Sequence, residues 1–272
     1  MVKVRIDPMR LFREPIVLLW KHRSMLLQTT RNDIRARYAG SVLGLIWLFL
    51  YPLMFLGAYA FMMVAVGSIR NLWDSPDKII LIFCGLIPFI GFAEALGMGV
   101  TAVSANANLI KNTLFPIELM PVRVVLSSQC TQVVGSFTLL IVLAVFHKLT
   151  LWALLLPVVW LCQVMFSFGL IWILSSLNVY FRDLQNIIGV MTLILMMVSP
   201  IYWTPDMIPE TLRPFMGINP LYYIIISHQE CLMFGRFPQG MVFWGLMILA
   251  VVFFFLGFGF FRRMKRVFAD NV

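Results

Sequence analysis

The sequence predicts an all-α protein that crosses a membrane several times. Of its 272 residues, 61% are hydrophobic and only 12% are charged, whereas soluble proteins carry about 25% charged residues. Several apolar runs reach the roughly 20 residues that a helix needs to cross a hydrocarbon core of about 30 Å. Short polar stretches separate these runs, so we expect one membrane domain over residues 41–262. Its six spans are expected at about 41–67, 79–103, 122–146, 151–179, 184–203 and 241–261.

Residues 1–40 predict a cytoplasmic amphipathic helix that lies in the membrane interface. Basic side chains alternate with apolar ones, and Arg23 falls on the apolar arc, so we expect the helix to bend or end there. A solvated basic tail is the alternative. The apolar arc of the helical wheel holds Phe12, Ile16, Leu19, Trp20, Leu26 and Leu27.

The first span begins after two glycines and carries a row of aromatic residues. Gly40 and Gly44 offer either a face for close helix approach or simple conformational freedom. Tyr51, Phe55 and Tyr59 recur every four residues and so share one face. Aromatic rings suit the apolar faces of sugars, but packing between helices or against lipid would place them there equally well.

The second span contains two residues that are unusual in an apolar helix. Pro88 removes a backbone donor, so a kink is expected. Glu94 is the only acidic residue well inside a predicted span. Intramembrane acids are costly and tend to be functional, so Glu94 is either a structural hydrogen-bonding group between helices or a conformational switch.

Residues 106–121 form a polar interruption with helical spacing. Their apolar side chains recur at helical intervals, and Pro116 and Pro121 punctuate the end. We expect a short amphipathic helix on the cytoplasmic face. Residues 204–239 are also distinct, because they are rich in proline and their apolar section 221–226 is too short to cross a bilayer. Short re-entrant helices in the outer leaflet are expected there, before the last span and the basic cytoplasmic tail 263–272.

The distribution of positive charge predicts the orientation and argues against nucleic acid as a partner. With the N-terminus inside, the cytoplasmic segments hold 16 of the 21 Lys and Arg residues and the outer segments hold five. This bias follows the positive-inside rule and places both termini in the cytoplasm. The basic clusters flank apolar runs, which indicates lipid head groups as their partners.

Motifs for most enzyme chemistry are missing from the sequence. There is no Walker A loop, and the histidines and four cysteines are scattered without metal-ligand spacing. We therefore expect no metal site, no cofactor and no catalytic residue in this chain. A membrane enzyme using Asp206, Glu210, Glu230 and Arg213 is one alternative, and an ion-coupled transporter is another. With Glu94 as the single intramembrane acid, energy supplied by a partner protein is the favoured interpretation.

Four patterns together resemble one family of membrane transport proteins. They are Asn32-Asp-Ile-Arg35-Ala-Arg37-Tyr, Asn106-x-Asn108-Leu109-Ile110-Lys111 with Phe115-Pro116-x-Glu118-x-x-Pro121, Tyr180-Phe-Arg182-Asp183-Leu184, and Ser199-Pro-Ile-Tyr202 followed by Asn219-Pro-Leu221. In order and spacing, they resemble the permease subunits of ABC-2 class exporters of bacterial surface polysaccharides, such as O-antigen. The resemblance covers nearly the whole chain.

This resemblance implies a homodimer in the bacterial inner membrane with two separate nucleotide-binding ATPase subunits, which would hold ATP and magnesium. It implies that residues 106–121 are the coupling helix that contacts the ATPase. It implies a polyprenyl-diphosphate-linked polysaccharide as substrate, which moves through a channel between protomers lined by their first and fifth spans. Capsule or teichoic-acid-type polymers are alternative substrates, and an ion-coupled lipid flippase is the alternative class.

The candidate site residues fall into three groups. For ATPase coupling they are Asn108, Leu109, Lys111, Phe115, Pro116, Glu118, Arg182 and Asp183. For the substrate channel they are Tyr51, Phe55, Tyr59, Met191, Leu195, Ser199 and Tyr202. For the point where a lipid diphosphate enters they are Arg35 and Arg37, whose alternative role is ordinary positive-inside anchoring.

Overall fold

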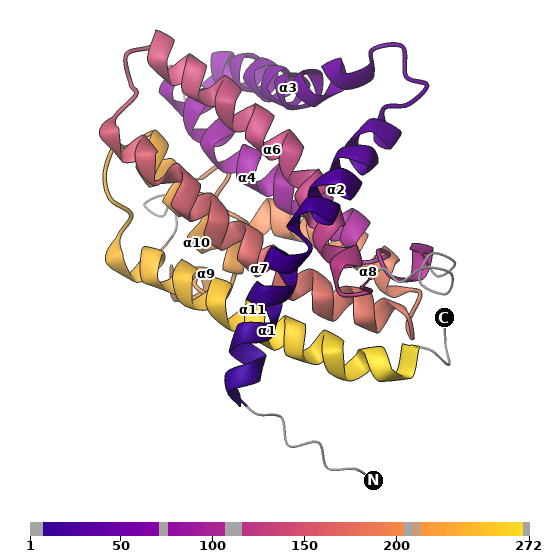
Figure 1. Cartoon of the computed structure of the whole chain (residues 1–272). Helices are drawn as coiled ribbons and strands as arrows, with labels where there is room; N and C mark the ends of the chain where they lie inside the picture. Colours follow the sequence, from indigo (N-terminus) through magenta and orange to yellow (C-terminus); the bar gives the residue numbers. More distant parts are fainter. Residues whose placement is uncertain are drawn as a thin grey trace.

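The computed structural model describes residues 8–70, 76–106, 116–203, 209, 211 and 213–268, and every regular element in those ranges is helical. The predicted all-α class is therefore confirmed. In chain order the elements are α1 (Pro8–Lys21), α2 (Arg23–Arg37), η1 (Gly44–Ile46), α3 (Trp47–Arg70), α4 (Pro76–Gly99), η2 (Ser104–Asn106), α6 (Leu119–Val145), η3 (Leu151–Leu155), α7 (Leu156–Asn178), α8 (Leu184–Val198), α9 (Arg213–Met216), α10 (Pro220–Leu232) and α11 (Gly240–Phe268). Figure 1 shows their arrangement.

Four helices in the described ranges are long and apolar enough to cross a membrane. They cover Asp77–Gly99, Leu119–Val145, Leu151–Asn178 and Gly240–Lys265, and they match the predicted second, third, fourth and sixth spans. The predicted first and fifth spans correspond to shorter apolar stretches, Gly44–Ala58 and Leu184–Val198. The basic residues at the end of the sixth span continue its helix, because α11 extends to Phe268.

Helices α7 and α11 run side by side and form the closest helix crossing described in the structure (Figure 1). A Cβ added at Gly169 would lie 2.1 Å from the backbone oxygen of Phe253, and one added at Gly257 would lie 2.1 Å from the backbone oxygen of Gly169. The two backbones are therefore in direct contact. Lipid tails are as apolar as the side chains that they replace, so close backbone packing at small residues is a main source of helix association in membranes.

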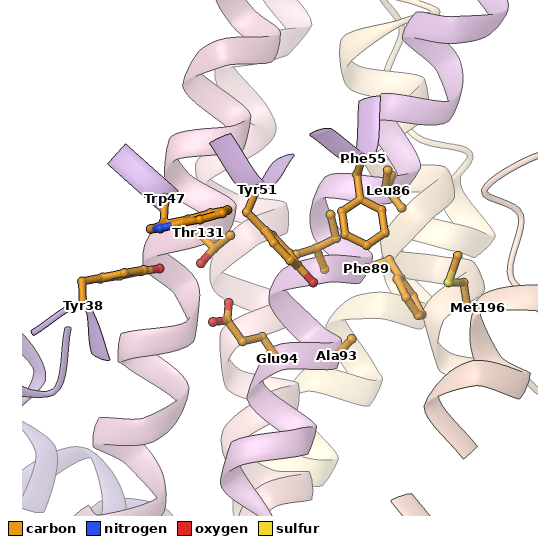
Figure 2. Close-up of a pocket in the computed structure, with 11 residues that line it drawn as sticks. Tyr38, Trp47, Tyr51, Phe55, Leu86, Phe89, Ala93, Glu94, Thr131 and Met196 are labelled. Carbon is orange, nitrogen blue, oxygen red and sulfur yellow. The ribbon is translucent and has the colours of Figure 1, made fainter. Parts of the chain in front are cut away.

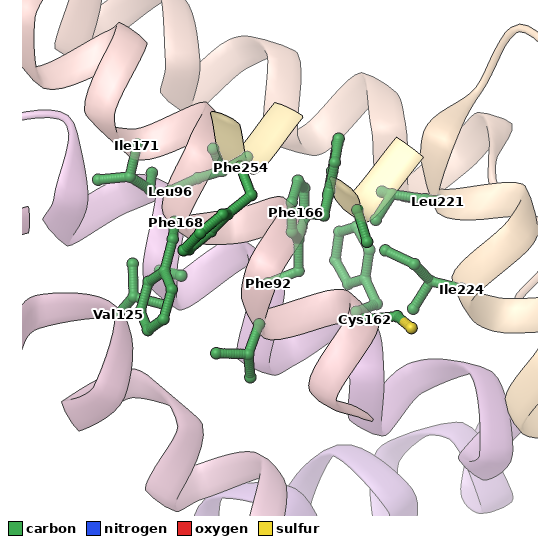
Figure 3. Close-up of a cluster of buried hydrophobic side chains, with 14 of the residues drawn as sticks. Phe92, Leu96, Val125, Cys162, Phe166, Phe168, Ile171, Leu221, Ile224 and Phe254 are labelled. Atoms are coloured by element: carbon green, nitrogen blue, oxygen red, sulfur yellow. The ribbon is translucent and has the colours of Figure 1, made fainter. Parts of the chain in front are cut away.

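Around this crossing, aromatic side chains fill the interior (Figure 3). Trp172 is fully buried, and its ring centroid lies 5.3 Å from that of Phe258. Its indole Nε1 donates a hydrogen bond of 2.9 Å to the backbone oxygen of Glu118. The ring of Phe92 from α4 stacks against Phe166 from α7 at 5.8 Å. These contacts join α4, α7 and α11 and the start of α6 into one core.

Buried amide side chains link α4, α6 and α7. Gln132 and Gln163 exchange two hydrogen bonds of 2.9 and 2.8 Å, and Gln163 Nε2 also donates to the carbonyl of Pro88 at 2.9 Å. All the polar groups involved lie away from water, so each must find its partner inside the protein. The network ties the proline turn of α4 to both neighbouring helices.

The N-terminal region is helical on both sides of His22, where α1 ends and α2 begins. The predicted break near Arg23 is confirmed. Trp20 and Leu27 remain exposed, whereas Leu26 is buried against the core. Glu14 of α1 forms an ion pair with Arg262 near the end of α11, so the two ends of the described chain are joined.

The connection between α2 and α3 turns through two glycines. Gly40 and Gly44 have φ angles of 78° and 50°, and no atom lies within 4 Å of a Cβ built on either one. The left-handed backbone favours glycine, and neither glycine makes a packing contact with the described residues of this chain. These observations favour conformational freedom as the role of the two glycines.

Within the predicted re-entrant region, the described residues form the short helices α9 and α10. Asn219 caps α10 by accepting a 3.0 Å bond from the backbone of Leu221. At the other end, Glu230 is 2% exposed and binds both Arg236 (2.7 Å) and the backbone nitrogen of Gln239 (2.8 Å). Glu230 thus holds the turn into α11. Asp206 and Glu210, the other acidic residues of the membrane-enzyme alternative, lie outside the described ranges.

We predict opposite effects for the same substitution at two glycines. Gly169→Ala should destabilise the protein by about 1–3 kcal/mol or more, because the new methyl group meets backbone that cannot move aside. Gly97→Ala, in α4 with nothing within 4 Å, should be neutral or stabilise by up to about 1 kcal/mol through helix propensity. Unfolding of the two purified variants in the same detergent measures both effects. Equal stability of the two variants would contradict the close backbone contact between α7 and α11 at Gly169.

Candidate functional site

A cavity of about 510 Å³ opens between α3, α4, α6 and α8. Its volume lies in the range of small-molecule binding sites. Figure 2 shows the side chains that surround it, with the aromatic rings on the α3 side and Glu94 below them. The lining residues are Tyr38, Trp47, Tyr51, Phe55, Leu86, Phe89, Ile90, Ala93, Glu94, Thr131 and Met196.

The aromatic wall comes mainly from α3. Trp47, Tyr51 and Phe55 are spaced by four residues and therefore project from one face of the helix. The rings of Tyr51 and Phe55 lie 5.0 Å apart at 60°. Tyr51 remains 45% exposed, so much of its ring is free to contact a ligand. The side chain of Tyr59, the third residue of the predicted row, is outside the part of the chain that the structure describes.

An ion pair lies at the edge of the cavity. Arg37, the last residue of α2, pairs with Oε1 of Glu94 on α4, and its other terminal nitrogen lies 2.9 Å from the sulfur of Met98. The two side chains are 20% and 23% exposed, so both are partly shielded. Oε2 of Glu94 is buried and has no well-formed hydrogen bond in the described ranges, although Thr131 lies beside it. The pair leaves this part of the cavity wall without net charge.

The predicted channel residues of the fifth span lie elsewhere. Met191 is 44% exposed on α8, and Leu195 and Tyr202 pack against the main core. Ser199 is fully buried and accepts a 3.0 Å bond from Asn219. The lining of the cavity includes none of these four, and α8 contributes Met196 instead.

The predicted coupling residues are only partly within the described ranges. Asn108, Leu109, Lys111 and Phe115 lie outside them. Glu118 is 8% exposed and pairs with Lys265 of α11 at 2.7 Å. Pro116 is partly buried just before it, and Pro121 lies in the first turn of α6.

Arg182 and Asp183 are exposed in the turn between α7 and α8. Together with neighbouring apolar side chains they line a second cavity, of about 550 Å³. Arg35 is exposed on α2, two residues before Arg37, whose side chain is partly shielded. Within the described ranges, no group of three or more His, Cys, Asp or Glu side chains has the arrangement of a metal site.

Sequence reasoning missed eight of the eleven residues in the cavity lining, and a signal existed for three of them. Trp47 extends the four-residue spacing of Tyr51 and Phe55 by one step, and Thr131 is a polar residue in an apolar span. Tyr38 follows the basic end of the interfacial helix. The other five are ordinary apolar residues of their helices, and only the folded arrangement brings them to the cavity. They are Leu86, Phe89, Ile90, Ala93 and Met196.

Long apolar helices and buried amide links between them define a polytopic membrane protein, and its helices enclose an aromatic cavity. The sequence profile of the ABC-2 type transporter family matches residues 24–233. The chain belongs to this family.

Individual relatives resemble the chain over almost its full length. It is 29% identical to an O-antigen export system permease protein of Myxococcus xanthus over 266 residues, which cover 97% of this chain and 99% of that protein. It is 29% and 30% identical to two O-antigen export system permease proteins of Klebsiella pneumoniae, over 90% of this chain and 94% of each of those proteins.

We predict that the Arg37–Glu94 pair is energetically coupled. Arg37→Gln should lower the free energy of unfolding more than the double variant Arg37→Gln with Glu94→Gln, because the single change leaves a shielded carboxylate without its cation. The coupling energy should be about 1–3 kcal/mol. Chemical unfolding of the three variants and the parent protein measures it, and additive effects would contradict the pairing.

Proposed function

We propose that this chain is the membrane-spanning subunit of an ATP-driven exporter that moves a polyprenyl-diphosphate-linked polysaccharide of the O-antigen type across the bacterial inner membrane. The observation that carries the proposal is the end-to-end similarity to O-antigen export system permease proteins. In this proposal the chain crosses the membrane six times with both termini in the cytoplasm. The short α8 and the α3 region supply the two remaining crossings.

In the proposed complex, two copies of the chain associate with two ATPase subunits, which hydrolyse ATP. Residues 106–121 face the ATPase, with Lys111 and its neighbours as contacts. Glu118 is already paired with Lys265, so its role is to fix the point at which α6 begins. The exposed turn with Arg182 and Asp183 is a second contact surface, because its cavity combines apolar walls with both signs of charge.

The polymer would pass along the aromatic cavity. Flat ring faces of Trp47 and Tyr51 suit the apolar faces of sugar rings. A cationic ligand fits less well, because Arg37 already neutralises Glu94. The same pairing argues against ion-coupled transport, since the carboxylate is not free to bind a coupling ion.

In this proposal the diphosphate of the lipid carrier meets the basic end of α2. Arg35 is exposed and offers a guanidinium to phosphate oxygens. Arg37 is already paired with Glu94 through one terminal nitrogen. The channel itself would form between two protomers, with the cavity of each facing the shared path.

We expect export to depend on the aromatic wall. Tyr51→Ala combined with Phe55→Ala should reduce surface polysaccharide at least about tenfold, as expected for the loss of about 1.4 kcal/mol of interaction. Phe49→Ala is the matched control, because Phe49 is an exposed aromatic residue of α3 that is not in the cavity lining. Surface polymer is compared at equal amounts of membrane-inserted protein. Normal polymer in the double variant would refute the proposed path.

We also expect ATP hydrolysis to require a partner. The purified chain alone should be inactive, whereas adding it to a co-expressed nucleotide-binding subunit should stimulate that subunit. Transport is tested directly in vesicles reconstituted with this chain and the nucleotide-binding subunit. Export by the chain alone that follows a proton or sodium gradient would overturn the ATP-driven mechanism.

A further inference from the structure

Helix α2 is held against the membrane helices by both apolar and polar contacts. Leu26 is buried in the main core, and one further apolar side chain of α2 packs against that core. Asp33 lies 3.4 Å from the Nε atom of Arg123 on α6, and Arg37 pairs with Glu94 on α4. Residues 33 and 37 are four apart and so share one face of the helix. Two ion pairs with two different helices therefore add to the core contact in positioning α2.

Arg123 makes a second contact on its other side. Its Nη2 donates a 2.9 Å hydrogen bond to Oδ1 of Asn106, the last residue of η2. The amide nitrogen of Asn106 in turn donates to the carbonyl of Ala102 at 2.9 Å. A neighbouring bond of 3.0 Å joins Asn178 of α7 to Ser104. The turn over 104–106 is thus fixed to α6 and α7 by side chains.

The contacts on the two sides of residues 107–115 are different. These nine residues lie outside the described ranges. On the N-terminal side, Asn106 is held by Arg123, which also reaches α2. On the C-terminal side, Glu118 is held by Lys265 of α11 and by Trp172 of α7. Of these contacts, those of Arg123 reach α2, the helix that precedes α3 in the chain.

We propose that Arg123 is a positioning residue that makes α2 and the 104–106 turn move as one body. The proposal rests on the proposed function, in which the segment after Asn106 faces an ATPase. A displacement of the turn would then pass through Arg123 to Asp33 and along α2. From there it reaches the glycine connection and α3, which carries Trp47, Tyr51 and Phe55 of the cavity wall.

The chemistry of arginine suits this role. A guanidinium carries its charge and its donors in one fixed plane. Arg123 can therefore bond to Asn106 through Nη2 while its Nε side attracts Asp33 as an ion pair without a hydrogen bond in the described ranges. The Arg123 side chain is 14% exposed, so water screens its contacts only weakly. A lysine has one charged atom on a flexible stem and would not hold Asn106 and Asp33 in the same geometry.

A double-mutant cycle in the purified chain, without any partner protein, tests whether Arg123 connects α2 to the 104–106 turn. Asp33→Asn and Asn106→Ala each remove one contact of Arg123, and no hydrogen bond joins Asp33 to Asn106 in the described ranges. If Arg123 connects them, their shifts in unfolding midpoint should be non-additive, and the non-additivity should vanish in an Arg123→Gln background. Additive shifts in the Arg123 protein would overturn the proposal.

A second measurement tests transmission in the complete complex with its ATPase. Arg123→Gln should lower the polysaccharide exported per ATP hydrolysed by about 2- to 30-fold, the range expected for energetic coupling through packed contacts. Arg123→Lys should restore little of it. Lys148→Gln is the control, because it removes an ion pair with Asp77 just beyond the opposite end of α6. An unchanged ratio in folded Arg123→Gln would overturn the proposal.

The two measurements separate this inference from the proposed function. If the unaltered chain fails to stimulate any nucleotide-binding subunit, the proposed function fails, and the midpoint cycle still decides whether Arg123 joins its two partners. If the unaltered complex exports polymer normally and the Arg123→Gln complex does so too, the proposed function stands and the proposed positioning role of Arg123 is wrong.

Discussion

The close crossing of α7 and α11 is the constraint on which the rest of the structure depends. Gly169 and Gly257 bring the two backbones into contact, and this allows Trp172 and Phe258 to meet across the same interface. In lipid, apolar burial gives little net gain, so shape at small residues decides which helices associate. Helices α4, α6 and α10 all pack directly against this pair.

Polar groups within the apolar helices serve two different purposes. Gln132 and Gln163 bond to each other, and Gln163 also bonds to Pro88, so three helices are tied together. In the Arg37–Glu94 pair one carboxylate oxygen is bound, while the other is buried without a hydrogen bond in the described ranges. The first arrangement is typical of structural connections, whereas the second leaves a polar atom unsatisfied beside a cavity.

Much of the fold could be predicted from the sequence because lipid imposes a length requirement that hydropathy reveals directly. The four long spans and the break near His22 follow from run length and from charge spacing. The contribution of α3 to the cavity followed from the spacing of Tyr51 and Phe55. Met196 and the partners of Arg123 did not follow, because they depend on contacts between residues distant in sequence. Gly40 and Gly44 were ambiguous because the same spacing suits packing and turning, and only the backbone angles distinguish the two.

The Arg37–Glu94 pair also has a consequence for the order in which the chain is made. Arg37 precedes Glu94 by 57 residues, so a ribosome completes α2 before the acidic residue is synthesised. An acidic residue inside an apolar span is costly to insert into a membrane, and Glu94 lies inside the helix Asp77–Gly99. The chain therefore already contains the cation that pairs with Glu94 when that residue is synthesised. The most costly residue of α4 is compensated by a helix that precedes it in biosynthesis.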